Sequence, residues 1–151
     1  MTSNRPAGPG PAFSPYAGLP LPQPTWDNHE FWEYCKRHEL RVQRCSDCGA
    51  YRFYPRPVCP ECQSRSFEWA AMSGRGTVYT YTVNYPPVLP YFADKVPMPV
   101  ALVELEAGEV FMVGRLMDVA PEDVHIDMAV EVTWEDVSED ISLPQWRKAG
   151  S

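Results

Sequence analysis

The sequence lacks several features that mark common classes of protein. None of its apolar runs approaches the ~20 residues that span a bilayer. It also lacks a basic start followed by an apolar run of roughly 7 to 15 residues, so we expect no signal peptide. These absences predict a cytoplasmic chain with no membrane partner.

Residues for catalysis are also scarce. The chain has only three histidines, His29, His38 and His125, which are scattered, and no Ser/His/Asp or paired-carboxylate constellation stands out. Cys35 and His38 fall on one face of a predicted helix, but a nucleophile pair would need a third, orienting group that is not found nearby. We therefore interpret both as packing residues and predict that the chain has no enzymatic activity of its own.

Basic charge is scarce in the second half of the chain. Residues 76–151 hold four basic residues against 13 acids, whereas residues 36–75 hold eight against four. A small β barrel could bind single-stranded nucleic acid by stacking bases on Tyr79, Tyr81 and Tyr85. An acidic barrel repels a polyanion, so we expect no nucleic-acid partner. Nucleic-acid binding stays an alternative hypothesis for the function of the chain.

Proline, by contrast, is concentrated at the start of the sequence. Residues 1–24 contain seven of the 17 prolines and one charged residue, Arg5. Such a composition cannot bury enough apolar surface to offset its conformational entropy. It predicts a disordered tail, or a linker from a longer fusion.

The remaining sequence predicts a mainly β fold in three parts. Residues 25–41 have a helical pattern that starts with a capping-box pair, Asp27 and Glu30. Residues 42–70 predict a metal-bound ribbon. Residues 71–147 alternate with a period of two in "GTVYTYTVNY", "VALVELE", "EVFMVGRLM" and "AVEVTWEDV", which favours a small barrel.

Four of the five cysteines form two Cys-x-x-Cys pairs, Cys45 with Cys48 and Cys59 with Cys62. Ten residues separate the pairs, and two such knuckles can close a tetrahedron around Zn²⁺. Four thiolates leave no open coordination position, so we predict one structural zinc per chain. Iron is the competing metal, because rubredoxin-type centres use the same ligands.

One loop is a candidate docking surface for a partner protein. The stretch "NYPPVLPYFADKVPMPV" is apolar and rich in proline, so it is costly to leave in water and cheap to order. The alternative is that the loop folds onto the core of the barrel. The predicted partner-binding residues are Tyr85, Val88, Leu89, Tyr91 and Phe92.

These motifs, in this order, resemble a known family. The segments "LRVQRCSDCGAYRFYPRPVCPECQS", "SGRGTVYTYT", "VALVELEAG" and "LPQW" are similar to those of zinc-ribbon/OB-fold proteins associated with acyl-CoA enzymes, domain-of-unknown-function family thirty-five. The resemblance runs from about residue 26 to residue 147. It departs at "IDMAV", where Asp127 and Ala129 replace the Gly and Pro of the family pattern, which concerns the geometry of one turn.

The resemblance implies an N-terminal helix, a rubredoxin-like zinc ribbon and a C-terminal OB barrel. It also implies an accessory subunit of a thiolase-fold enzyme, with a retro-aldolase that cleaves steroid side-chain CoA esters as the favoured partner. An acetoacetyl-CoA thiolase/HMG-CoA synthase-type complex is the alternative, and a hot-dog-fold hydratase is a further partner class. For an acyl-CoA ligand, the predicted contacts to the CoA phosphates are Arg52, Arg56, Arg65 and Arg75.

Overall fold

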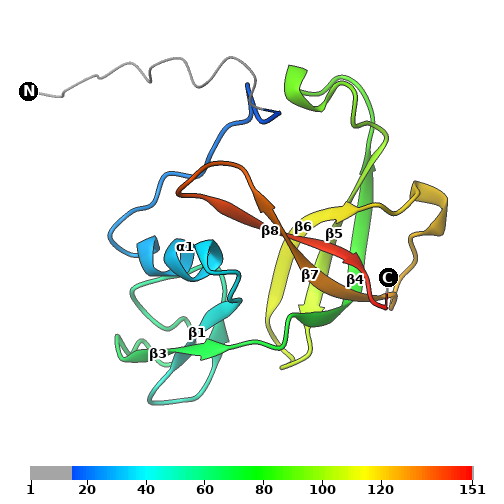
Figure 1. Ribbon diagram of the computed structural model, residues 1–151. Helices are drawn as coiled ribbons and strands as arrows, with labels where there is room; N and C mark the ends of the chain where they lie inside the picture. Colours follow the sequence, from blue (N-terminus) through cyan, green and yellow to red (C-terminus); the bar gives the residue numbers. More distant parts are fainter. Residues whose placement is uncertain (1–14, 151) are drawn as a thin grey trace, which may run out of the picture.

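The computed structural model describes residues 15–150, which form a short helix, a three-stranded ribbon and a closed barrel (Figure 1). Residues 1–14 of the predicted tail and Ser151 lie outside the described residues. The predicted mainly β architecture is confirmed. Within residues 15–150, no helix is long and apolar enough to cross a membrane.

Helix α1 (His29–Lys36) is shorter than the predicted span of 25–41. Phe31 and Cys35 lie one turn apart and are both buried, which accounts for the helical stripe in the sequence. The helix ends before His38, whose φ of 59° is left-handed and cannot continue an α helix.

The predicted capping box does not form at the start of this helix. Asn28 occupies the N-cap, and its side chain makes no capping hydrogen bond. Instead, the Asn28 Oδ1 atom accepts a hydrogen bond from the Thr25 backbone N–H at 2.7 Å, and its Nδ2 atom donates to the Tyr54 hydroxyl at 2.9 Å. The start of the helix is thereby attached to the ribbon.

The ribbon is an antiparallel sheet with strand order β2-β1-β3. The central strand pairs with a two-residue strand on one side and a five-residue strand on the other. The three strands are β1 (Arg41–Cys45), β2 (Tyr51–Arg52) and β3 (Phe67–Ala71).

The barrel contains the four predicted strands and one more, in the order β4-β5-β6-β8-β7, and β4 pairs with β7 to close it. Two 3₁₀ turns, η1 (Pro90–Phe92) and η2 (Pro121–Asp123), lie in its connections. The strands are β4 (Arg75–Asn84), β5 (Met98–Leu105), β6 (Phe111–Met117), β7 (Ala129–Asp136) and β8 (Ser142–Lys148).

Strand β8 is the element that the periodicity did not predict. It pairs antiparallel with β7 over its whole length, but in parallel with β6 at only two positions, Leu116↔Trp146 and Met117↔Arg147. Pro144 lies inside it and has no N–H to donate, so the segment does not resemble a strand in sequence. The barrel is therefore weakly closed at the β6–β8 seam.

The ribbon and the barrel meet at a tight junction. The Met72 N–H donates to the Leu40 carbonyl at 2.8 Å, and the Val132 N–H donates to the Gly74 carbonyl at 2.7 Å. Gly74 has a φ of +82°, and a Cβ there would lie 2.7 Å from Val132 Cγ1. Only glycine fits this position without a shift of the barrel wall.

Candidate functional site

The four paired cysteines lie in two neighbouring turns of the ribbon. Cys45 ends β1 and Cys48 follows in a tight turn, while Cys59 and Cys62 flank a second turn before β3. One ligand atom from each of the four side chains falls within 4.8 Å of the others. The structure thus brings together the residues that the spacing predicted.

Both turns have the same backbone geometry. The Gly49 N–H donates to the Cys45 carbonyl at 3.0 Å, and the Gln63 N–H donates to the Cys59 carbonyl at 2.9 Å. Gly49 has a φ of 76° and Gln63 a φ of 62°, so both residues are left-handed. The second knuckle is as regular as the first, although a glutamine adopts the left-handed conformation there.

The sulfur geometry fits one tetrahedral zinc ion. The Sγ atoms of Cys45 and Cys62 are 3.5 Å apart, and those of Cys48 and Cys59 are 3.7 Å apart. A tetrahedron with Zn–S bonds of ~2.3 Å has S···S edges of about 3.8 Å. The four sulfurs would fill the coordination sphere, so the zinc would hold the two knuckles together and leave no position for a substrate.

Backbone hydrogen bonds favour the thiolate form of the first cysteine in each knuckle. The N–H groups of Cys48 and Asp47 lower the pKa of Cys45 to about 6. The N–H groups of Cys62 and Glu61 lower the pKa of Cys59 in the same way. Each knuckle therefore contributes one sulfur that favours the thiolate form, whereas the pKa of Cys48 is raised and that of Cys62 is raised to about 12.

The fifth cysteine, Cys35, takes no part in this site. Its side chain is fully buried in the core beneath α1, and burial raises its pKa to about 12. It is a packing residue, as predicted. His38, by contrast, is exposed, and its Nε2 atom lies 2.8 Å from Asp136 Oδ1 on the barrel.

The structure does not gather the four arginines that were predicted to contact CoA phosphates. Arg52 is buried, its Nε atom donates to Gln43 Oε1 at 2.8 Å, and its guanidinium lies over the Phe67 ring. Arg56 is exposed and lines the same small cleft as Arg52, whereas Arg75 lines a separate cleft beside acidic residues. Arg65 is exposed and lines neither. A single phosphate site made of all four is not formed.

The predicted docking loop is divided between surface and core. Tyr85 and Leu89 are 63% and 54% exposed, so they are available to a partner. Val88 and Phe92 are half-buried, and Tyr91 is buried. The structure corrects the prediction for Tyr91, because its side chain is already covered by this chain.

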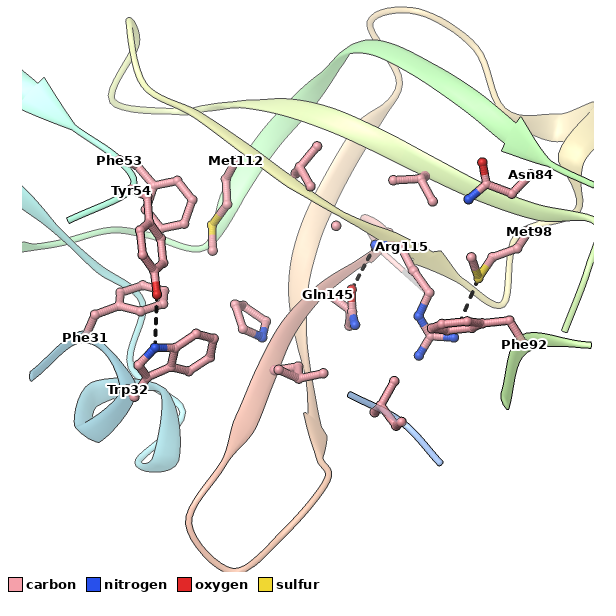
Figure 2. A pocket seen from close by; sticks show the side chains of 16 residues that line it. Phe31, Trp32, Phe53, Tyr54, Asn84, Phe92, Met98, Met112, Arg115 and Gln145 are labelled. Atoms are coloured by element: carbon pink, nitrogen blue, oxygen red, sulfur yellow. Dashed lines mark hydrogen bonds between the residues drawn. The ribbon is translucent and has the colours of Figure 1, made fainter. Parts of the chain in front are cut away.

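An apolar pocket of about 460 Å³, which no pattern in the sequence indicated, lies between α1 and the barrel (Figure 2). It lies where β6 and β8 separate beyond their two paired positions. Its lining comes from segments far apart in the sequence, so no local pattern could have revealed it. The lining residues are Leu19, Phe31, Trp32, Phe53, Tyr54, Asn84, Phe92, Met98, Val100, Met112, Val113, Gly114, Arg115, Leu143, Pro144 and Gln145.

Comparison with protein families gives two matches that together cover residues 32–135. Residues 32–68 match the family described as "ChsH2, rubredoxin-like zinc ribbon domain". Residues 69–135 match "ChsH2, C-terminal OB-fold domain". The first match confirms the predicted zinc, and the second confirms the predicted OB barrel.

Curated relatives fall into two groups. A probable enoyl-CoA hydratase alpha subunit from Thermomonospora curvata is 36% identical over 89% of this chain and 41% of its own length. The 3-oxo-4,17-pregnadiene-20-carboxyl-CoA hydratase alpha subunit of Mycobacterium tuberculosis is 40% identical over 83% of this chain and 37% of its own length. This chain thus spans about two fifths of these alpha subunits. A DUF35 domain-containing scaffold protein from Methanocaldococcus jannaschii is 39% identical over 72% of this chain and 77% of its own length.

Two solved structures are also similar to this chain. One chain of the Ltp2-ChsH2(DUF35) aldolase superimposes with a TM-score of 0.77 at 36% identity, over 85% of this chain and 99% of that chain. A DUF35-family protein from Sulfolobus solfataricus has a TM-score of 0.58 at 16% identity, over 82% of this chain and 85% of that chain, which shows the shared fold.

Proposed function

Because this chain belongs to the DUF35 family of ChsH2-type zinc-ribbon and OB-fold proteins, we propose that it is a non-catalytic accessory subunit of a thiolase-fold acyl-CoA enzyme. The favoured partner is a retro-aldolase that cleaves steroid side-chain CoA esters. The observation that carries this proposal is the match to 99% of one chain of the Ltp2-ChsH2(DUF35) aldolase.

The chemistry of the described residues supports a role without catalysis. The four thiolates of the ribbon would be saturated by their zinc. Cys35 stays a neutral thiol at physiological pH, because burial raises its pKa to about 12. His38 pairs with a carboxylate at the exposed junction of ribbon and barrel. We expect the isolated chain to turn over CoA esters at well below ~1 s⁻¹.

A second candidate partner follows from the scaffold proteins among the relatives. Because one of these is matched over 77% of its length, a complex of the acetoacetyl-CoA thiolase/HMG-CoA synthase type remains the alternative. The hydratase alpha subunits among the relatives support a hydratase as a further partner, and the family resemblance implies that this hydratase has the hot-dog fold.

Co-purification tests the partner class. The chain is co-expressed with the Ltp2-type aldolase of the same organism, and with a thiolase as the comparison. Co-elution with the aldolase, together with cleavage of a steroid side-chain CoA ester that neither chain performs alone, is expected. Co-elution with the thiolase instead would favour the alternative complex, and binding to neither would contradict the proposal.

The docking surface is tested by a double substitution, Tyr85→Asp with Leu89→Asp. Both side chains are exposed, so zinc content and melting temperature should not change while the complex is lost. Ile126→Asp is the matched control, since Ile126 is 51% exposed and lies outside the predicted docking loop, residues 85–99. A complex that survives the double substitution would place the interface elsewhere.

A further inference from the structure

We propose that the pocket between α1 and the β6–β8 seam binds an apolar ligand that carries one uncharged oxygen acceptor, such as a ketone. This site belongs to the chain itself, and its existence does not depend on the identity of the partner enzyme. Two features of the molecule support this ligand class, the shape of the pocket and the polar groups at one end of it.

The pocket lies beside the β6–β8 seam, where the barrel is closed by only two paired positions. On the N-terminal side of Leu116↔Trp146, strands β6 and β8 do not pair. The Gln145 side chain crosses the gap there and accepts a hydrogen bond from the Arg115 backbone N–H at 2.8 Å. Phe31, Trp32 and Phe53 wall the gap on the side of the helix and the ribbon. A volume of about 460 Å³ lies within the ~300–1,000 Å³ that is usual for small-molecule sites.

The two ends of the pocket differ in chemistry. Figure 2 places the aromatic rings of Phe31, Trp32 and Phe53 at one end, and Arg115 with Asn84 at the other. The polar groups at the aromatic end are the Trp32 Nε1 group and the Tyr54 hydroxyl, which are already paired: Trp32 Nε1 donates to this hydroxyl at 3.1 Å, and Asn28 Nδ2 donates to it at 2.9 Å. A ligand that fills the pocket would therefore be apolar over most of its length.

The opposite end has hydrogen-bond donors to spare. Arg115 directs Nη2 to the carboxylate of Glu135, while the hydrogen-bond partner of its Nη1 atom within residues 15–150 is the Met98 sulfur, at 3.9 Å. The side-chain amide of Asn84 makes no hydrogen bond to another residue in the described part of the chain. A sulfur at this distance is a weak acceptor, so an oxygen of the ligand would be a better partner for these donors.

The net charge at this end selects an uncharged acceptor. The Arg115 guanidinium and the Glu135 carboxylate are only 14% and 10% exposed, and each neutralises the other. Gln145 also donates to this carboxylate, at 3.1 Å. An anionic ligand would add a second negative charge in a largely desolvated place, which is unfavourable. A ketone or ester carbonyl accepts the same hydrogen bonds without that cost.

Displacement of a fluorescent probe tests the ligand class. N-phenyl-1-naphthylamine, an uncharged apolar fluorophore, is added to the full zinc-loaded chain, and its emission is titrated with three twelve-carbon competitors: 2-dodecanone, dodecane and dodecanoate at pH 7. We expect the probe to become fluorescent and 2-dodecanone to displace it at about tenfold lower concentration than the other two. Equal displacement by dodecanoate would overturn the proposal, and so would a probe that stays dark.

Two variants locate the binding. Leu143→Trp fills the pocket and should abolish probe fluorescence, whereas Ile126→Trp, the same change at an exposed apolar residue outside the pocket, should not. Asn84→Leu removes one donor without breaking a side-chain hydrogen bond, so it should keep probe binding and remove most of the preference for the ketone.

Retained probe fluorescence in Leu143→Trp would overturn the site, and an unchanged ketone preference in Asn84→Leu would overturn the proposed polar end. A different result would be that no competitor displaces the probe but Leu143→Trp abolishes co-purification with the partner enzyme. The pocket would then bind a segment of the partner protein, and the ligand proposal would be wrong. The outcome with the partner enzyme is read separately, by co-elution, so either proposal can fail while the other stands.

Discussion

The ribbon and the barrel are two β units of one chain that are stabilised in different ways. In the described part of the ribbon, the buried apolar side chains are those of Val42, Pro55 and two of the cysteines, Cys45 and Cys59. The barrel buries a full core that includes Trp146, Met112 and several valines. Folding therefore depends on a cation in the ribbon and on apolar burial in the barrel, so each unit can be disrupted separately.

The largest effect is expected from removing one zinc ligand. Cys59→Ser should abolish zinc binding and unfold the ribbon, because metal binding in such sites contributes roughly 10–16 kcal/mol to folding. Zinc analysis and hydrogen exchange are the measurements, and we expect protection to be lost over residues 41–71 and largely kept in the barrel strands. Cys35→Ala, at a buried cysteine that is not a ligand, should keep one zinc per chain. A Cys59→Ser protein that melts like the parent would contradict this account of the ribbon.

The converse test removes the largest side chain of the barrel core. Trp146 is fully buried against Gly114, where an added Cβ would lie 2.8 Å from the indole. Trp146→Ala should lower the free energy of unfolding by about 3–5 kcal/mol in urea denaturation, while the folded fraction still holds one zinc. Trp26→Ala is the matched control, because Trp26 is 77% exposed. If zinc is released at the same urea concentration at which the barrel unfolds, the ribbon and the barrel unfold together and not independently.

An effect of similar size, but one that a second substitution should largely reverse, is expected at the buried ion pair of the barrel. Arg115→Met leaves Glu135 buried without its partner and should cost roughly 3–5 kcal/mol, whereas Arg115→Met with Glu135→Leu should recover much of this loss. A double-mutant cycle measured by urea denaturation gives the coupling. Additive effects of the two substitutions would show that the pair is not coupled.

The smallest effect is expected where the two units touch through solvent-exposed side chains. The His38 ring stacks on Trp134 with centroids 5.3 Å apart and meets Asp136 at 2.8 Å. His38→Ala should change the free energy of unfolding by less than about 1 kcal/mol, because both members of the ion pair are exposed. Thermal melting at low and high salt measures it, with Lys36→Ala, which breaks a more exposed pair to Asp140, as the comparison. A loss above 2 kcal/mol, by the scale of exposed pairs, would show that this contact holds the units together.

Features written in short, regular patterns could be predicted from sequence. The spacing of Cys45, Cys48, Cys59 and Cys62 fixes which side chains can share an ion, and the structure brings their sulfurs together. Alternation in β5, where Val103 and Leu105 are buried between half-buried neighbours, indicates a strand with one face in the core.

Features that depend on several distant segments could not be predicted. The proline in β8 hides that strand, and therefore also the β6–β8 seam and the pocket beside it. The composition of the 85–99 loop does not indicate which of its side chains are exposed and which are buried. Tyr85 and Tyr91 are the same residue type, yet Tyr85 is exposed and Tyr91 is buried. Likewise, the sequence near Arg52 shows a basic residue, and only the fold shows that Gln43 and the Phe67 ring enclose it.

The position of β8 in the chain has a consequence for how the protein is made. The last residue of the ribbon sheet is Ala71, whereas the barrel needs β8, which ends at Lys148, to join β6 and β7. At synthesis rates of about 5–20 residues per second, the ribbon strands leave the ribosome roughly 4–15 s before the barrel can close. During that interval the cysteines can already capture zinc, while the apolar strands of the barrel still lack a closing partner. Zinc supply therefore acts on the nascent chain first, and the barrel is the part that a chaperone would need to protect.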